Sequence, residues 1–438
     1  MRASVKELGS VGATVTLAAV AGFLAPNYAA VIVACILGAT LVVFSYMRPR
    51  IALVLWLTIV VVVPNWTTIY VVGIGMPPSS AVGIPVLAGV AAARIAGPDK
   101  LRISWMDWSL AVASLIVTLL WIGGELQGIY FVRDLLLVWV LAYILGRNAD
   151  EMVKSAFAVL MAIAAVWGIL EFMFGVHLFV DWMPSATHTL NHIQSRAGVD
   201  RSEAAFGHAI AYGASLAMAI PFAQNLRKHS LTVQLLLAAG IIVSLSRGPL
   251  IALAVTLVLL TWVTASSSKL RVRYIALTVV GASAVWVVLD RMYSGVYAEE
   301  VVSSGDSRSS QWEVIQPALR WFSSALTYFG PDATAEVRGI AIIDSTPLRL
   351  AANYGIVAAV LFSIPVVVAA WRVFRREAGS ASIALAGQIP VLAVTSFITQ
   401  WQALVFFVMG LVVTESMARV KGPARSLTIE RRDTEVDV

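Results

Sequence analysis

A single arginine, Arg247, interrupts an apolar stretch that runs from Leu231 to Ala265. This stretch is long enough for two membrane crossings of about 17–20 residues each. A guanidinium stays protonated, and placing it inside a bilayer costs several kcal/mol. Because Ser244, Ser246 and Gly248 flank Arg247 and can end a helix, we expect a tight hairpin tip at the membrane surface. There Arg247 either reaches lipid phosphates or is a fixed cation for an anionic substrate.

Other chemically capable side chains gather in two long segments between apolar stretches. The segment 178–204 contains His188, His192, Arg196, Asp200, Arg201 and Glu203. The segment 291–347 contains Arg308, Trp312, Arg338 and Asp344. Segments longer than a connection needs are often functional, and aromatic rings beside carboxylates and arginines are typical of sugar sites. The alternative is a cap that only shields the helices, with its aromatic residues as interface anchors.

The histidines do not form a recognisable metal site. His188 and His192 are four residues apart, but no third ligand follows at a recognisable spacing. A Walker loop, a dinucleotide fingerprint and an acidic pair near the membrane are also missing. We therefore expect chemistry without a metal or cofactor, and no nucleic-acid partner. His208, near the outer end of an apolar span, either bonds a helix backbone or contacts substrate.

The elements that position these residues are membrane helices. The chain has 438 residues, of which 59% are hydrophobic and 13% charged, and its mean hydropathy is +0.84. Soluble domains of this length carry more charge, so we expect an all-α integral membrane protein with about 12–14 transmembrane helices. Its single cysteine, Cys35, excludes a disulfide framework. The apolar spans lie at 11–25, 28–46, 51–64, 81–97, 108–124, 135–146, 155–177, 205–224, 231–246, 249–265, 274–289, 349–371, 381–398 and 400–418.

Basic residues gather in every second connection, which by the positive-inside rule marks the cytoplasmic side and places both termini there. Every lysine then falls inside, whereas the basic residues left outside are all arginine, whose planar fork suits phosphate. We expect the following organisation: 1–290 as transmembrane helices 1–11 with an external loop at 178–204, 291–347 as a large external loop carrying short helices, 348–418 as C-terminal transmembrane helices, and 419–438 as a disordered cytoplasmic tail.

The large external loop contains a candidate surface helix. Apolar residues recur at helical spacing through Ser307–Leu326, which predicts an amphipathic helix along the bilayer. Ser307 is its expected N-cap, and Pro317 predicts a kink. The next membrane helix is expected at 349–371, with Arg349 near its outer end.

Three segments together resemble the O-antigen ligase and O-antigen polymerase superfamily. The first is AFGHAIAYGASLAMAIP (205–221) and the second is LSRGPL (245–250). The third comprises Ser307-Arg308 with Trp312, Tyr328–Pro331 and the closing motif DSTPLRLAANYG (344–355). The resemblance covers residues 204–361, and the preceding spans match only in topology. It implies a bacterial inner-membrane glycosyltransferase of the GT-C class, inverting and metal-independent, that takes glycan from a polyprenyl-diphosphate carrier at the outer leaflet.

The resemblance also implies residue roles. By position, Arg247 contacts the diphosphate, and Arg196 or Arg201 is the candidate second ligand. Fixed guanidinium groups suit this role because they can stabilise the charge that develops on the leaving diphosphate. The candidates for contact with the glycan or the glycan or lipid acceptor are His208, Arg308, Arg338 and Trp312.

One departure from the family concerns the catalytic residue. Ligases usually have histidine where this chain has Asp344. Asp344 can act as general base on the acceptor hydroxyl, or it can pair with Arg338 or Arg349 and only hold the loop. The missing histidine favours a polymerase, or a transferase for another surface polysaccharide such as capsule or exopolysaccharide. A transporter or flippase of lipid-linked or anionic solutes and a non-catalytic envelope scaffold remain the alternatives.

Overall fold

The computed structural model describes residues 29–71, 74–97, 102–179, 194–196, 199–226, 228–263, 310–329 and 334–420, with isolated positions between 272 and 283. This part of the chain is mostly helical. Among the described residues, five helices are long and apolar enough to cross a membrane: α4 (Pro78–Ala96), α5 (Trp105–Ile122), α8 (Glu151–Phe174), α16 (Ile356–Phe374) and α19 (Thr399–Val420). The helical membrane class expected from the sequence agrees with this architecture.

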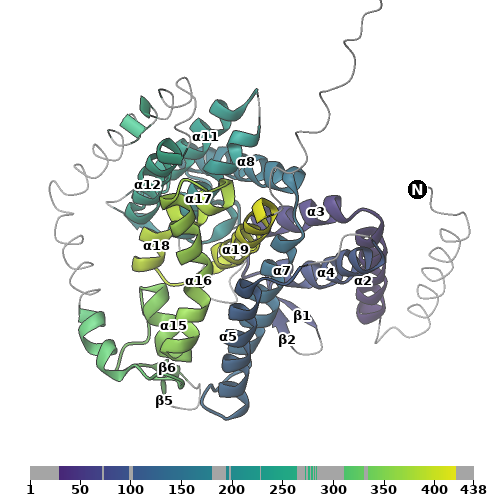
Figure 1. The fold of residues 1–438 in the computed structure, drawn as a ribbon, viewed down its shortest axis with the longest axis vertical. Coiled ribbons are helices and arrows are strands. Elements are labelled where there is room, and N and C mark those ends of the chain that lie inside the picture. Colours follow the sequence, from purple (N-terminus) through teal and green to yellow (C-terminus); the bar gives the residue numbers. More distant parts are fainter. Residues whose placement is uncertain are drawn as a thin grey trace, which may run out of the picture.

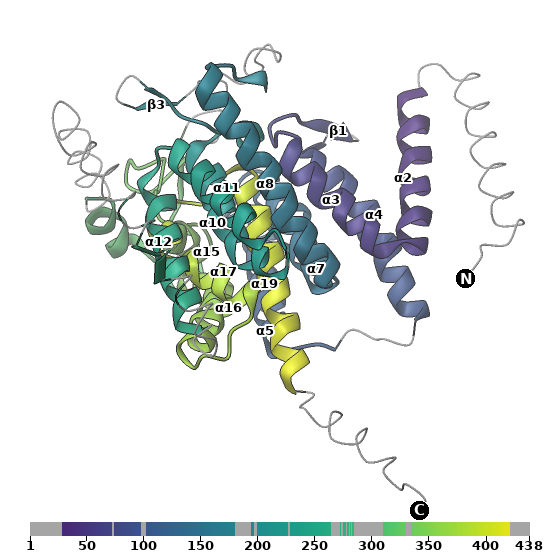
Figure 2. The ribbon, with the colours of Figure 1, turned by 90° about the horizontal axis from the view of Figure 1, so that it is seen from above.

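Helix α19 lies in the centre of the bundle (yellow in Figures 1 and 2). Most of its side chains from Trp401 to Val413 have no exposed surface or almost none. It packs against α7 (Leu141–Arg147), against α17 (Ser380–Gly387) and against α10 (Ala209–Ala219). The N-terminal helices α2 (Ala29–Met47), α3 (Pro49–Val62) and α4 lie to one side of it, and α12 (Arg247–Val263) lies to the other.

The hairpin tip predicted around Arg247 is present. Helix α11 (Ser230–Val243) ends before a three-residue turn, and α12 begins at Arg247. Within the turn Leu245 has φ +47°, a left-handed conformation that L-residues rarely adopt. The predicted span 205–224 is three elements instead of one: η3 (Ala204–Phe206), α10 and η4 (Ile220–Asn225).

The predicted span 349–371 is wrong in one respect, because it is two helices. The short α15 (Thr346–Tyr354) carries Arg349, and α16 begins only after Gly355. Gly355 has φ +87°, and a Cβ there would lie 2.8 Å from the carbonyl oxygen of Trp321. A continuous helix therefore cannot pass through this position.

The amphipathic helix predicted for Ser307–Leu326 is shorter than expected. Within its described residues, helix covers 310–315 and a 3₁₀ turn, η5 (Gln316–Ala318), follows at Pro317. The chain beyond that turn forms backbone hydrogen bonds with α16 instead. The carbonyl groups of Arg320 and Trp321 accept from the first N–H groups of α16, at Ile356 (2.9 Å) and Val357 (3.0 Å). These N–H groups have no partner within their own helix, so the extended segment satisfies them.

Three two-stranded antiparallel hairpins were not predicted. They are β1 (Ile69–Val71) with β2 (Ile74–Met76), β3 (Ser195–Arg196) with β4 (Val199–Asp200), and β5 (Thr327–Phe329) with β6 (Thr334–Glu336). Their registers pair Ile69 with Met76, Ser195 with Asp200 and Thr327 with Glu336. Several predicted features lie outside the described residues: span 11–25, most of span 274–289, the tail beyond 420, and Arg308, Ser307, His188 and His192.

Candidate functional site

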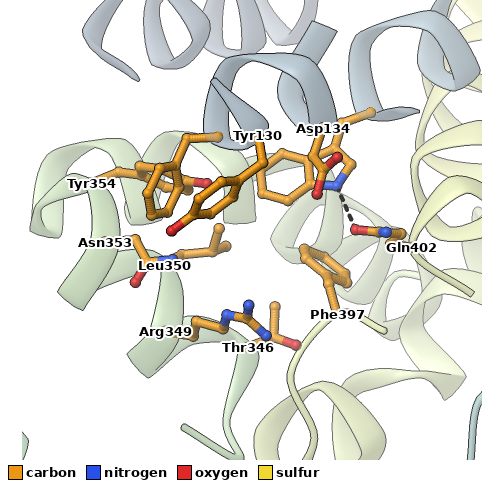
Figure 3. A pocket seen from close by; sticks show the side chains of 11 residues that line it. Tyr130, Asp134, Thr346, Arg349, Leu350, Asn353, Tyr354, Phe397 and Gln402 are labelled. Atoms are coloured by element: carbon orange, nitrogen blue, oxygen red, sulfur yellow. Dashed lines mark hydrogen bonds between the residues drawn. The ribbon is translucent and has the colours of Figure 1, made fainter. Parts of the chain in front are cut away.

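A polar pocket of about 90 Å³ lies where three segments distant in sequence meet: the helical stretch 130–147, α15, and the start of α19. Figure 3 shows Asp134 and Gln402 along one side of it, and Arg349 and Thr346 along the other. The complete lining is Tyr130, Phe131, Asp134, Trp139, Thr346, Arg349, Leu350, Asn353, Tyr354, Phe397 and Gln402. One carboxylate and one guanidinium thus share a pocket with five aromatic rings.

Asp134 stands at an irregularity in its helix. The stretch begins as α6 (Tyr130–Arg133), continues as a π-helix, η2 (Asp134–Val140), and ends as α7. π-helical turns are rare and frequently occur at functional sites. The Nε atom of Arg133 donates to Asp134 Oδ1 at 2.8 Å, and its Nη1 atom donates to the carbonyl oxygen of Gly75 at 3.0 Å. The β1–β2 hairpin therefore helps to hold this carboxylate in place.

Arg349 faces the pocket from the first turns of α15. Its Nη1 atom donates to Ser396 Oγ at 3.1 Å, and its side chain is exposed. Within the described part of the chain no carboxylate forms an ion pair with Arg349. The guanidinium therefore retains most of its donors for a ligand, and it suits phosphate or carboxylate.

The aromatic rings of the pocket form one packed cluster. Trp139 stacks on Phe406 with 5.0 Å between ring centroids, and it contacts Tyr354 edge-on at 6.1 Å. Its indole Nε1 donates to Gln402 Oε1 at 2.9 Å, the bond drawn in Figure 3. Tyr130 is 40% exposed, and its hydroxyl points into the pocket. A polar rim over aromatic faces is an arrangement that can bind a sugar ring.

An apolar cavity of about 320 Å³ adjoins the polar pocket. The two share Thr346, Leu350 and Phe397 as lining residues. Apart from Thr346 and Ser363, the described residues that line the cavity are apolar. Both hydroxyls already donate to carbonyl groups, Thr346 to Thr395 at 2.6 Å and Ser363 to Ala359 at 2.8 Å. The cavity therefore offers hydrocarbon contact next to a charged pocket.

A larger groove of about 710 Å³ continues from this cavity along α16, and the two share Pro347, Ser363 and Val367. Trp312, one of the predicted acceptor-contact residues, lines the groove together with Trp105. Trp312 lies outside the polar pocket, and 48% of its surface is exposed. Its place beside an apolar groove suits contact with a lipid chain better than contact with a sugar.

Arg201 and Arg247, both predicted diphosphate ligands, meet at the turn between α11 and α12. Arg201 is 9% exposed, and its Nε atom donates to the carbonyl oxygen of Ser244 at 3.2 Å. Its Nη2 atom donates to Ser246 Oγ. Arg247, half-buried, is the next residue along the chain and the first of α12. Arg201 is thus bonded to the short turn that Arg247 directly follows, and a shared anion stays a prediction.

His208 was expected either to bond a helix backbone or to contact substrate, and the structure has the bond to the backbone. Its Nδ1 atom accepts from the N–H of Ile210 at 3.2 Å and caps α10. A neutral imidazole is required, because a proton on Nδ1 would remove the acceptor. A contact with glycan or acceptor stays a prediction.

The other predicted site residues lie apart from the polar pocket. Asp344 is half-buried two residues before α15, where its backbone N–H donates to Gln311 Oε1 at 3.0 Å. Arg338 is exposed at the tip of a tight turn between Val337 and Ile340, with φ +49°. Arg196 lies in β3, and Arg308 lies outside the described residues. Roles for all four remain predictions.

Arg349 in the polar pocket and the turn that precedes Arg247 both lie near the end of α18 (Ile389–Val394), where the chain leads into α19. Gly248, in the first turn of α12, lies close to Val391 and Val394. Immediately beyond, Thr395 accepts from Thr346, and Ser396 accepts from Arg349. Residues 395–396 therefore contact α15, and the preceding helix α18 lies beside the first turn of α12.

No protein-family model, no curated protein and no solved structure matches this chain. The resemblance to O-antigen ligases and polymerases therefore rests on the quoted motifs alone. Within the described residues, no group of three or more His, Cys, Asp or Glu side chains is arranged to hold a metal ion. The metal-independence of the reaction stays a prediction.

Sequence reasoning did not select Asp134, Asn353 or Gln402, although all three line the polar pocket. One signal was available for Asp134, because the pair Arg133-Asp134 directly precedes the apolar span 135–146. Arg349 was placed outside the membrane but assigned only to a possible pair with Asp344. Its position in the pocket follows from the break at Gly355, which the apolar pattern does not reveal.

Proposed function

We propose that this protein transfers or polymerises a polyprenyl-diphosphate-linked oligosaccharide at the outer leaflet of a bacterial cytoplasmic membrane, in surface-polysaccharide biosynthesis. The observation that carries the proposal is the polar pocket, which shares Thr346, Leu350 and Phe397 as lining residues with the apolar cavity beside it. A substrate that fits both must combine a charged or polar head with a hydrocarbon chain. Twelve to fourteen spans with both termini cytoplasmic belong to the same proposal.

In this proposal the lipid chain occupies the apolar cavity and the groove along α16. The diphosphate lies at the polar end, where Arg349 is available, and Arg247 with Arg201 contacts it from the side of the α11–α12 turn. Fixed guanidinium groups stabilise a leaving diphosphate because they are oriented before the reaction begins. The aromatic rings of the polar pocket hold the sugar adjacent to the diphosphate.

The reaction consists of one displacement. An acceptor hydroxyl attacks the anomeric carbon, the bond from that carbon to the diphosphate oxygen breaks, and the polyprenyl diphosphate leaves with the bonding electrons. The hydroxyl proton passes to a carboxylate. Asp344 is the candidate from the resemblance, and Asp134 is the candidate from pocket geometry.

The test is reconstitution of the purified protein in lipid nanodiscs with a polyprenyl-diphosphate-linked oligosaccharide. We expect mass spectrometry to detect extended glycan and free polyprenyl diphosphate in equal amounts. Arg247→Lys keeps the charge but loses the bidentate fork, so it should lose transfer, whereas Arg375→Lys, at an exposed position just after α16, should retain it. Substrate that crosses a proteoliposome unchanged would identify a transporter. If the substrate neither reacts nor crosses the bilayer, a non-catalytic envelope scaffold is the remaining alternative.

A further inference from the structure

Three buried ionisable side chains lie beside Arg201 and have no part in the proposed reaction. They are Glu171 near the end of α8, His177 just after α8, and Glu203, and they are 4%, 3% and 2% exposed. His177 Nδ1 and Glu171 Oε1 form an ion pair. We name these three residues the buried acid cluster. Charged groups are rarely buried to this extent unless they have a task or a partner.

The buried acid cluster and α8 hold the backbone of residues 202–204, which directly follow Arg201. Glu171 Oε2 accepts from the N–H of Ala204 at 2.7 Å, and Ser202 Oγ donates to the carbonyl oxygen of Gly168 at 2.7 Å. Ala204 has φ +46°, a left-handed conformation that costs a residue with a Cβ roughly 1–2 kcal/mol. The bond from Glu171 helps to hold this strained residue. Segment 201–204 is thus attached to α8 on one side.

The same segment is attached to the α11–α12 turn on the other side. The N–H of Ser202 donates to the carbonyl oxygen of Val243 at 3.3 Å, and Arg201 bonds Ser244 and Ser246. Arg201 is therefore held between the turn that its guanidinium bonds and the segment that Glu171 and Ser202 attach to α8.

We propose that the buried acid cluster is a proton-coupled positioning element for Arg201: an anion binds at Arg201 while Glu203 is protonated, and its binding draws a proton onto Glu203. This inference rests on the proposed function only in naming a diphosphate as the anion. It assigns Glu203, Glu171 and His177 as positioning residues, because none of them needs to touch the substrate.

Electrostatics around Glu203 support this assignment. The charged groups that act on its carboxyl are Glu171 on α8, His177 beyond α8, and Arg201 on its own segment; Asp200 on β4 acts on His177. Burial and, second, the Glu171 carboxylate raise the pKa of Glu203 to about 8. Within the described residues, Glu203 Oε2 also lacks a hydrogen-bond partner.

The direction of the coupling follows from charge. Loss of the Glu203 proton would place a second carboxylate beside Glu171 and a negative charge near Arg201. Both effects weaken the attraction of Arg201 for an anion. By linkage, an anion bound at Arg201 must favour the protonated form of Glu203 by the same free energy.

The test uses the full-length protein in nanodiscs and inorganic pyrophosphate as the probe. Calorimetric titration at about pH 8, in buffers of different ionisation enthalpy, counts the protons taken up on binding. Pyrophosphate itself titrates in this range, so Glu203→Gln, which has the shape of the protonated acid, supplies the baseline. We expect wild type to take up as much as about half a proton more than Glu203→Gln, since about half of Glu203 is deprotonated at its pKa. Glu313→Gln removes an exposed carboxylate outside the cluster and should behave like wild type.

A second measurement requires neither anion binding nor activity. Infrared difference spectra of the wild type between about pH 6 and about pH 9 should contain a buried protonated-carboxyl band that titrates near pH 8 and is absent from Glu203→Gln. Equal proton uptake by wild type and Glu203→Gln, or no such band, would overturn the inference even if glycan transfer is confirmed. If both signals appear and no glycan transfer is found, the proposed function fails and the proton-coupled anion site stands.

Discussion

Replacement of Arg349 by glutamine tests the polar pocket most directly. Glutamine retains a donor that can reach toward Ser396 but removes the positive charge. The folded state should tolerate the change, because Arg349 is exposed and its side chain donates one hydrogen bond within the described part of the chain, to Ser396. A neutral hydrogen bond of this kind contributes about 0.5–1.5 kcal/mol. The variant should therefore fold and show nearly the thermal stability of the wild type.

The effect on binding should be much larger. A hydrogen bond between a guanidinium and a phosphate contributes about 1.5–3 kcal/mol, and each 1.4 kcal/mol is a factor of ten in Kd. We therefore expect Arg349→Gln to raise the Kd of a polyprenyl diphosphate about 10- to 150-fold. Arg349→Lys retains the charge without the fork, so its Kd should lie between those of wild type and Arg349→Gln.

Two ligands distinguish binding of the charged head of the substrate from binding of its lipid chain. Native mass spectrometry or fluorescence titration in nanodiscs can measure Kd for a polyprenyl diphosphate and for the uncharged polyprenol. Arg349→Gln should weaken only the first, whereas Arg338→Gln, at an exposed turn outside both pockets, should weaken neither. A wild-type Kd for the diphosphate in Arg349→Gln would refute the pocket assignment. An equal loss for polyprenol would show that the variant had lost its fold.

Two further predictions concern catalysis and the fold. Asp344→Asn should lower kcat by about 10²-fold or more in the nanodisc assay, with little change in Kd, because it removes the proposed base; normal turnover there, with a loss in Asp134→Asn, would move the base to Asp134. Gly355→Ala should lower stability by about 1–3 kcal/mol, since its φ is +87° and its Cβ would meet the Trp321 carbonyl oxygen at 2.8 Å. Thermal unfolding in detergent would measure this, with Gly38→Ala as a control because nothing lies within 4 Å of a Cβ there; equal melting temperatures would contradict the steric argument.

The sequence predicted the elements whose signals are local. The apolar stretch around Arg247, interrupted by Ser244, Ser246 and Gly248, predicted the hairpin tip, and the structure has one there. The break at Gly355 was missed because the residues after it continue an apolar run. At the break the N–H groups of Ile356 and Val357 donate to the carbonyl oxygens of Arg320 and Trp321, and no local pattern encodes a partner some 35 residues away.

The polar pocket was missed for a similar reason, because its residues are even farther apart in the sequence. Asp134, Arg349 and Gln402 come from three helices and meet only through packing around α19. The buried acid cluster was missed for another reason, which is the hydropathy pattern around its residues. Glu171 lies within the apolar span 155–177, where a single acid does not disturb the hydropathy pattern. His177 is the last residue of that predicted span and Glu203 belongs to the predicted external loop 178–204, so no local pattern placed them together, yet both are buried.

The proposed reaction uses Arg349 in the polar pocket together with Arg201 and Arg247 near the α11–α12 turn. The connection at 395–398 lies between these two places. Irregular backbone at membrane depth is tolerated where it lines a cavity or is held by protein. Here Thr395 and Ser396 are attached to α15, while Gln400 Nε2 donates to the carbonyl oxygen of Ala205 at 2.6 Å. Ala205 directly follows the strained Ala204 that Glu171 holds. The Arg349 pocket and the Arg201 segment are therefore joined through one short, well-bonded connection. In the proposed transfer reaction, such a connection would keep donor and acceptor at a fixed separation while one bond forms and another breaks.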